Sequence, residues 1–258
     1  MGSRGTVPRR TVLATVGTLA GAGCLGRTGD VAAPSIADPR IESDWHLVDR
    51  TRGVADEAAI GPMPVRAHEH RVQYRYEPLH RELTTLFDLE GEAAATFFAS
   101  RLDLRPGIDG LPFGVGSDRV MATLREATIE AFLEEMRIHG IESIDRTDER
   151  TVDTGVQPAG REYRFEAALP IEGTLPYPAG ASVPVSASLP LWVILRIWHD
   201  GANALVAGGV APAEPVATAF DIPDSIAGIQ EELFAGTAMA AAPSHLQEQI
   251  RAFLEATH

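Results

Sequence analysis

The chain has 258 residues, of which 45% are hydrophobic and 22% charged, a composition typical of a globular domain rather than of a disordered chain or a membrane bundle. All 22 basic residues are arginine, which excludes Schiff-base, Walker A and Ser-x-x-Lys chemistry because each of these needs a lysine. The 36 acidic residues give a net charge of −14, and without a basic stripe to neutralise phosphates the chain is not expected to bind nucleic acid.

Residues 1–23 predict an export signal. They carry three arginines and no acid, and the apolar stretch over 11–23 is shorter than the roughly 20 residues that a membrane-spanning helix needs. Arg9 and Arg10, followed by Thr11 and two apolar residues, resemble the twin-arginine signal, which exports proteins that have already folded. The resemblance implies that the folded part of the chain works outside the cytoplasm.

Cys24 is the only cysteine, so the chain can form no internal disulfide. It follows the apolar stretch directly, and its surroundings (GAGCLG) resemble a lipobox, whose cysteine receives a lipid and becomes the mature N-terminus. A lipid contributes about 0.8 kcal/mol per buried CH₂ and would hold the domain on the outer face of the cell membrane. The lipobox usually has Leu where this chain has Gly21, so cleavage after Ala22 with release, or an uncleaved anchor, stays open.

The charge of the mature chain predicts a salt-rich environment. Without residues 1–23, 19 arginines face 36 acidic residues, a net charge of −17. At molar salt the Debye length is about 3 Å, so this charge costs little self-repulsion and keeps the surface hydrated. Acidity with arginine as the sole cation resembles the secreted proteins of halophilic archaea.

The rest of the chain predicts a tether and one domain. Residues 24–40 are rich in Gly, Pro and small side chains without a period, which is typical of a linker. Residues 41–258 show no internal repeat and can bury the core of a single domain. Strand patterns occur at residues 44–52, 65–76, 93–104, 142–154, 162–169, 191–198 and 204–210. Five prolines between 169 and 191 indicate a long loop.

Helical patterns occur at residues 118–139, 224–233 and 244–256. The first has a candidate buried stripe, and the last has Ser244 and Gln247 in the spacing of a capping box. Strands, a long helix, more strands and then helices predict an α+β fold. We expect a mostly antiparallel sheet covered by a long central helix and C-terminal helices.

His68 and His70 are the sharpest candidate for chemistry. Two positions apart on a strand, they share a face with Val72, Tyr74 and Tyr76, so both rings could reach one Zn²⁺ or Cu²⁺. No third ligand can be identified, and the alternative is a half-buried pair bonded to backbone. A row of acids at positions 126, 130 and 134 is interpreted as a solvated helix face rather than a Ca²⁺ or Mg²⁺ site.

No nucleophile motif of the G-x-S-x-G type is present, and Cys24 lies outside the expected fold. The sequence therefore predicts neither catalytic residues nor a cofactor. Trp192 and Trp198 share one strand face, which indicates packing; an aromatic sugar-binding stripe is the alternative.

The export signal, Cys24, the acidic body and the order of elements together resemble uncharacterised haloarchaeal lipoproteins exported by the twin-arginine route. The layout is also loosely similar to the α/β/α sandwiches of photosystem accessory proteins. These resemblances imply a lipid-anchored extracytoplasmic binding or accessory module and no reaction. The alternatives are a secreted metal-dependent hydrolase using His68 and His70, and a structural partner of a membrane complex.

Overall fold

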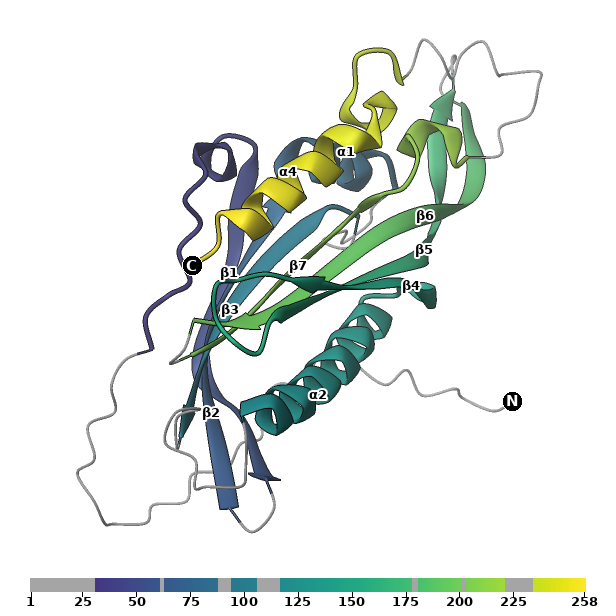
Figure 1. The fold of residues 1–258 in the computed structure, drawn as a ribbon. Helices are drawn as coiled ribbons and strands as arrows, with labels where there is room; N and C mark the ends of the chain where they lie inside the picture. Colours follow the sequence, from purple (N-terminus) through teal and green to yellow (C-terminus); the bar gives the residue numbers. More distant parts are fainter. Residues whose placement is uncertain are drawn as a thin grey trace, which may run out of the picture. The chain divides into compact units, whose positions relative to one another are not determined.

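Seven strands in the described part of the chain form one sheet, and all its neighbouring strands are antiparallel. Their order is β1-β2-β3-β7-β6-β5-β4, so the hairpins β1-β2 and β4-β5 form the two edges (Figure 1). The strands are β1 (Trp45–Ile60), β2 (Met63–Tyr76), β3 (Thr96–Arg105), β4 (Glu142–Val152), β5 (Gly160–Tyr177), β6 (Ala181–His199) and β7 (Ala204–Pro212).

The structure is a computed structural model that describes residues 31–60, 63–87, 94–105, 117–177, 181–200, 203–220 and 234–258. The expected export signal with Arg9 and Arg10, the predicted lipidation site Cys24 and the predicted helix over 224–233 lie outside these residues. Among the described residues, no helix has the length and apolar character needed to cross a membrane.

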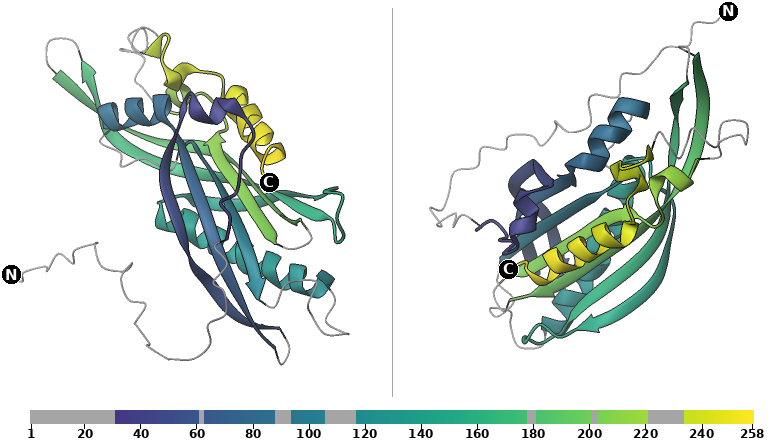
Figure 2. Two further views of the ribbon diagram at one scale, coloured as in Figure 1. Left: turned by 90° about the vertical axis from the view of Figure 1, so that its left-hand side faces the viewer. Right: turned by 90° about the horizontal axis from the view of Figure 1, so that it is seen from above.

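Helices cover both sides of the sheet. Helices α1 (Glu77–Phe87) and α4 (Pro243–Glu255) lie on one side and α2 (Ser117–Ile138) lies on the other (Figures 1 and 2). Three short 3₁₀ helices, η1 (Pro39–Glu42), η4 (Val216–Thr218) and η6 (Ala238–Ala240), complete the described elements.

The prediction of an α+β fold with an antiparallel sheet is confirmed, but the long central helix is wrong. Helix α2 forms an outer layer, since its buried side chains lie on one stripe and Glu126, Glu130 and Glu134 are exposed on another. The centre of the molecule is the sheet itself, because β7 is buried along its whole length and β6 is buried from Val193 to His199. Strands covered on both faces are apolar throughout, as the run LWVILRIW in β6 is.

The side chains of each strand alternate between two faces. On β2, Arg71 points toward α2, where it pairs with Glu135. The face that packs against α4, called the α4 face, includes His68, His70 and Val72 of β2 and the even-numbered residues of β6 from Trp192 to Trp198. Gly209 of β7 lies under α4, where an added Cβ would stand 2.7 Å from Ile250 Cγ2. The α4 helix therefore lies close against the sheet.

The long loop predicted over 169–191 is wrong, because β5 and β6 continue there as a paired ribbon. Pro170 pairs with Ser188, and Pro184 pairs with Thr174. In the described residues this part of the ribbon has no further strand alongside, apart from one bridge between Ala187 and Phe220, so a missing proline N–H removes no ladder hydrogen bond there.

One helix was missed by the sequence analysis, and one predicted helix cap is wrong. The helix α1 follows β2 without a loop, and its Glu82 carboxylate accepts backbone N–H bonds from Ala238 and Met239, 2.9 Å each. Helix α4 begins at Pro243 without a side-chain cap, so the capping box expected from Ser244 and Gln247 is wrong; Gln247 instead donates to the Pro212 carbonyl.

Residues Val31–His258 form one compact unit, which includes residues 31–40 of the segment interpreted as a tether. Ser35 exchanges two backbone hydrogen bonds with His258, at 3.0 and 2.9 Å, and Ile36 forms a bridge with Thr257. The first described residues therefore pair with the last ones, and both are held on the α4 side of the sheet.

Candidate functional site

The two predicted metal-binding histidines lie on the α4 face of β2, opposite Asp103 and Arg101 of β3. His70 is fully buried, and its Nδ1 lies 3.2 Å from the Val31 carbonyl oxygen and 3.2 Å from Arg52 Nε. Among the described residues, no three His, Cys, Asp or Glu side chains are grouped so that they could hold a metal ion. His70 thus contacts a backbone carbonyl, which is the environment that the sequence analysis gave as the alternative to metal binding.

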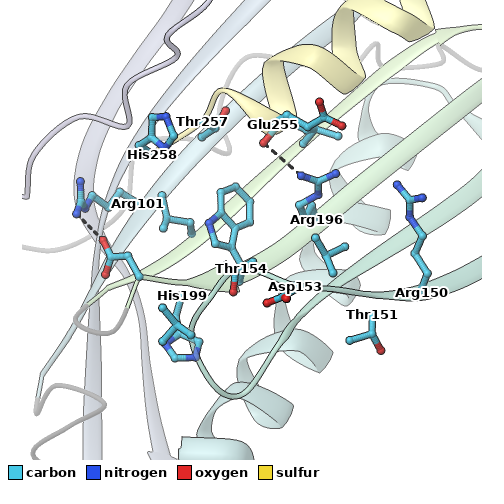
Figure 3. Close-up of a pocket in the computed structure, with 16 residues that line it drawn as sticks. Arg101, Arg150, Thr151, Asp153, Thr154, Arg196, His199, Glu255, Thr257 and His258 are labelled. Atoms are coloured by element: carbon cyan, nitrogen blue, oxygen red, sulfur yellow. Dashed lines mark hydrogen bonds and ion pairs between the residues drawn. The ribbon is translucent and has the colours of Figure 1, made fainter.

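An open pocket of about 760 Å³ lies on the α4 face, where the ends of several elements meet (Figure 3). Arg101 comes from β3, Arg150 from β4, and Arg196 from β6, while Glu255 and His258 come from the end of α4 and the residues after it. The remaining lining residues are Thr151, Val152, Asp153, Thr154, Val156, Trp198, His199, Asp200, Leu205, Leu254 and Thr257.

The floor of this pocket contains a buried ion cluster around Glu162 of β5. The Glu162 side chain is inaccessible to solvent, and its Oε2 accepts from Arg196 Nη2 at 2.7 Å and Nε at 3.2 Å. Its Oε1 lies 2.6 Å from Arg150 Nη2 and 3.5 Å from Arg164 Nη2. The cluster forms because antiparallel pairing places Arg196 opposite Glu162 on one side and Arg150 opposite it on the other.

The electrostatics of the cluster keep Glu162 ionised. Burial by itself raises the pKa of Glu162, but hydrogen bonds from Arg150 and Arg196, together with their charges, bring it below its usual value. The same hydrogen bond raises the pKa of Arg150. Asp148 Oδ2 also lies 3.8 Å from Arg164 Nη1, and the charges of Asp148 and Glu255 act on Arg150, so neighbouring carboxylates match these guanidinium groups.

The two lining arginines that contact Glu162 differ in how exposed their side chains are. The Arg196 side chain is 9% exposed, and its Nη1 also points to the Leu254 carbonyl, 3.4 Å away at the end of α4. The Arg150 side chain is 48% exposed and contacts Glu162 through Nη2. Arg196 is therefore a fixed part of the floor, whereas Arg150 presents the rest of its guanidinium to the open space.

The walls are polar and of mixed charge. Arg101 Nη2 pairs with Asp200 at 2.6 Å, and Asp153 Oδ1 accepts the Gly155 N–H at 2.9 Å. Thr154 Oγ1 is buried at the wall and has no hydrogen-bond partner among the described residues. The arrangement suits a small polar molecule that offers both hydrogen-bond acceptors and donors.

A second hollow of about 410 Å³ lies on the opposite face, between α2 and strands β2 and β3. Phe98 and Phe132 line it, and the bidentate pair of Arg71 with Glu135, at 2.9 and 2.7 Å, bridges the sheet and α2. Arg71 also lies over the Phe98 ring, 4.8 Å from its centroid. This pair and the aromatic contacts attach α2 to the sheet.

Sequence reasoning missed the pocket on the α4 face but contained a signal for its floor. Arg196 is the one charged residue inside the apolar run of β6, which indicates a buried ion pair. The partner could not be chosen, because it lies 34 positions earlier in the chain and depends on strand register. Trp192, whose ring is covered by Arg251 at 4.8 Å, and Trp198 occupy one face as expected.

Comparison with known proteins gives one match. A family model described as a domain of unknown function, DUF6517, matches residues 33–256. No curated protein and no solved structure matches the chain.

Proposed function

The chain belongs to the DUF6517 family, and we propose that it is a lipid-anchored binding or accessory protein on the outer face of the cell membrane of a halophilic archaeon. Its ligand site in this proposal is the pocket on the α4 face. The family description states no function, so the proposal is carried by the residues of this chain.

The observation that carries the binding function is the ion cluster at the pocket floor. A carboxylate and a guanidinium removed from water are costly unless they are paired, and here Glu162 and Arg196 are held in one geometry by several contacts. Such a floor is rigid before any ligand arrives, which lowers the entropy cost of binding. The open volume above it accommodates a small molecule.

The anchoring function is supported by the N-terminal sequence. Arg9 and Arg10 match the twin-arginine pattern, and Cys24 follows the apolar stretch where a lipoprotein cysteine is expected. Six residues lie between Cys24 and Val31, the first residue of the compact unit Val31–His258. The alternative hydrolase using His68 and His70 gains no specific support, since His70 is engaged by Val31 and Arg52.

Anchoring is tested by Cys24→Ser in the native host. We expect the wild-type protein in the membrane fraction, and the Cys24→Ser protein either in the medium or stalled as the unprocessed precursor. A variant with Arg9→Lys and Arg10→Lys serves as the export control and should accumulate inside the cell. Unchanged fractionation of Cys24→Ser would contradict lipid anchoring.

Ligand binding is tested by blocking the pocket without changing its charge. Val152→Trp places an indole in the pocket, and Val54→Trp makes the same change at an exposed position of β1, where the side chain is 55% exposed. The proteins are isolated from the host at molar salt, denatured, and their released small molecules identified by mass spectrometry. The wild type and Val54→Trp should release the same molecule in stoichiometric amount, and Val152→Trp should release none. Release of nothing by the wild type, or equal release by both variants, would overturn the binding function.

A further inference from the structure

The hollow between α2 and the sheet is a second cavity, on the face opposite the α4 face (Figures 1 and 2). Small side chains line part of it. Ala67 of β2 and Ser100 of β3 lie on its sheet side. Ala127 and Ala131 of α2 lie on its helix side, and both remain exposed. Helix α2 therefore leaves an open space of about 410 Å³ here instead of packing closely on the strands.

The walls of the hollow are mostly apolar. Phe98 and Leu102 come from β3, Leu124 and Phe132 from α2, and Val206 from β7. A concave, largely apolar cavity with a few polar groups is the usual form of a small-molecule site in proteins. The space therefore fits a ligand with an apolar body.

The charged side chains that line the hollow do not balance. They are Glu69, Arg71 and Glu135, and the bidentate pair of Arg71 with Glu135 neutralises two of them. Among the described residues Glu69 has no arginine partner, and its hydrogen bond there comes from the Ser100 hydroxyl. The lining of the hollow thus carries one uncompensated negative charge.

Ser100 holds the Glu69 carboxylate in place. Ser100 is 3% exposed, and its Oγ donates to Glu69 Oε1 at 2.6 Å. Because the hydroxyl proton is used in this bond, Ser100 Oγ has only lone pairs left to offer, as has Glu69 Oε2. Thr128 adds a further hydroxyl from α2. A group with several N–H donors would satisfy these acceptors together.

We infer that the hollow binds a small molecule with a primary ammonium group and an apolar body, with Glu69 accepting from the ammonium. The charge of such a group balances Glu69, and its three N–H donors match the acceptors around it. A charge-assisted hydrogen bond of about 2.8 Å is shorter than the Debye length of about 3 Å at molar salt, so screening does not abolish it. Dissolved cations compete for the carboxylate but gain nothing from the apolar walls. This site is separate from the ligand pocket of the proposed function.

Isothermal titration calorimetry at molar KCl tests the inference. The protein is the full chain with Cys24→Ser, isolated from the native host, because without a lipid it needs no detergent that would compete for the hollow. The probes are benzylammonium, its uncharged analogue benzyl alcohol, and methylammonium, which lacks the apolar body. We expect benzylammonium to bind at least about tenfold more tightly than either of the others. No measurable binding of benzylammonium, or equal affinities for it and the alcohol, would overturn the inference.

Glu69→Gln removes the charge but keeps an oxygen that can accept from Ser100. It should weaken binding of benzylammonium by about tenfold or more, and it should leave binding of benzyl alcohol unchanged. Glu166→Gln is the matched control, because it removes an exposed carboxylate from β5 and should leave both affinities as they are. Equal affinities of the two variants for benzylammonium would show that Glu69 is not its partner and would reject the assignment.

A second set of variants locates the ligand. Ala131→Trp fills the hollow with an indole, whereas Thr123→Trp places one at an exposed position of α2 outside the lining. Ala131→Trp should abolish binding of benzylammonium, and Thr123→Trp and Val152→Trp should bind it like the unsubstituted chain. If Val152→Trp loses binding and Ala131→Trp keeps it, the ammonium lies in the pocket on the α4 face and the inference is wrong.

Discussion

Glu162 is the residue on which the pocket floor depends most. It is buried between guanidinium groups from β4 and β6, and it gives Arg196 its counter-charge. Removing one partner of a buried pair leaves the other charge uncompensated, which costs about 3–5 kcal/mol in proteins. The contacts of Glu162 with Arg150 and Arg196 therefore hold strands β4, β5 and β6 in register. This holds even if an apolar replacement of the whole cluster would give the same stability.

We predict that Glu162→Gln lowers the free energy of unfolding by about 3 kcal/mol, because Arg196 then stays buried beside a neutral amide. Glu166→Gln is the control on the same strand, where the side chain is exposed, and should change stability by less than about 0.5 kcal/mol. Chemical denaturation of the two variants at one fixed molar salt concentration measures both. Similar small changes in the two would show that Arg196 finds another partner.

The same residue predicts how stability changes with pH. Its arginine partners place the folded pKa of Glu162 below the usual value of 4.5, so the folded state binds fewer protons than the unfolded state in this range. Its contribution is therefore complete above the unfolded pKa and is lost as the pH falls through the folded pKa. We expect the free energy of unfolding to decrease as the pH falls below about 4.5, and to decrease less steeply in Glu162→Gln. Denaturation curves across this range check it; parallel pH profiles would contradict it.

At the scale of elements, close packing of α4 on β7 needs the absence of a side chain at Gly209. An added Cβ would lie 2.7 Å from Ile250 Cγ2 and 2.9 Å from the Thr96 carbonyl oxygen, and the second contact involves backbone that cannot swing away. We predict that Gly209→Ala destabilises the fold by about 2 kcal/mol, within the usual range for overpacking. Thermal unfolding measures the effect.

The matched control is Gly53→Ala on the edge strand β1, where nothing lies within 4 Å of the added Cβ. It should be neutral or slightly stabilising, since alanine loses less backbone entropy than glycine on folding. If both variants melt at the same temperature, α4 moves off the sheet at little cost and its packing is looser than the contacts indicate.

Local patterns predicted the regular strands and the two longer helices, because alternation and helical spacing are properties of neighbouring residues. The helix α1 had such a signal too: Leu79, Leu83 and Phe87 recur every four residues after Pro78, which suits the first turn. It was missed because the alternating strand β2 continues into it without a turn. The β5-β6 ribbon was missed for another reason, since its prolines are tolerated only where no neighbouring strand lies alongside.

The candidate site shows where prediction from sequence stops. The pair of His68 and His70 was found because its spacing is local, and its parity on β2 was correct. The pocket depends instead on residues from β3, β4, β6 and the end of α4, which strand register and helix docking bring together. Arg196 could be recognised as unusual, but neither Glu162 nor Arg150 could be assigned to it without the sheet order.

At the scale of the whole molecule, most exposed charged side chains interact with water and dissolved salt rather than with other parts of the protein. The edge strand β4 is exposed at nine of its eleven positions and carries both acids and arginines, and charged edges discourage pairing with other chains. The acidic row Glu126, Glu130 and Glu134 on α2 is also exposed. These acids have few cationic neighbours, one being Arg137, which lies 3.4 Å from Glu134. Dissolved ions must therefore screen the repulsion among these carboxylates.

We predict that the melting temperature falls when salt is diluted below about 0.5 M, because the Debye length lengthens and the acidic surface repels itself. The effect should be continuous with ionic strength, since it arises from many exposed acids rather than from one site. Thermal unfolding followed by circular dichroism, over a series of KCl concentrations, measures it. A parallel series in sucrose at matched osmolality separates charge screening from general exclusion of the solute from the protein surface. If sucrose restores the melting temperature as well as KCl does, or if dilution leaves it unchanged, repulsion among the surface acids is not what limits stability and adaptation to high salt loses its physical basis.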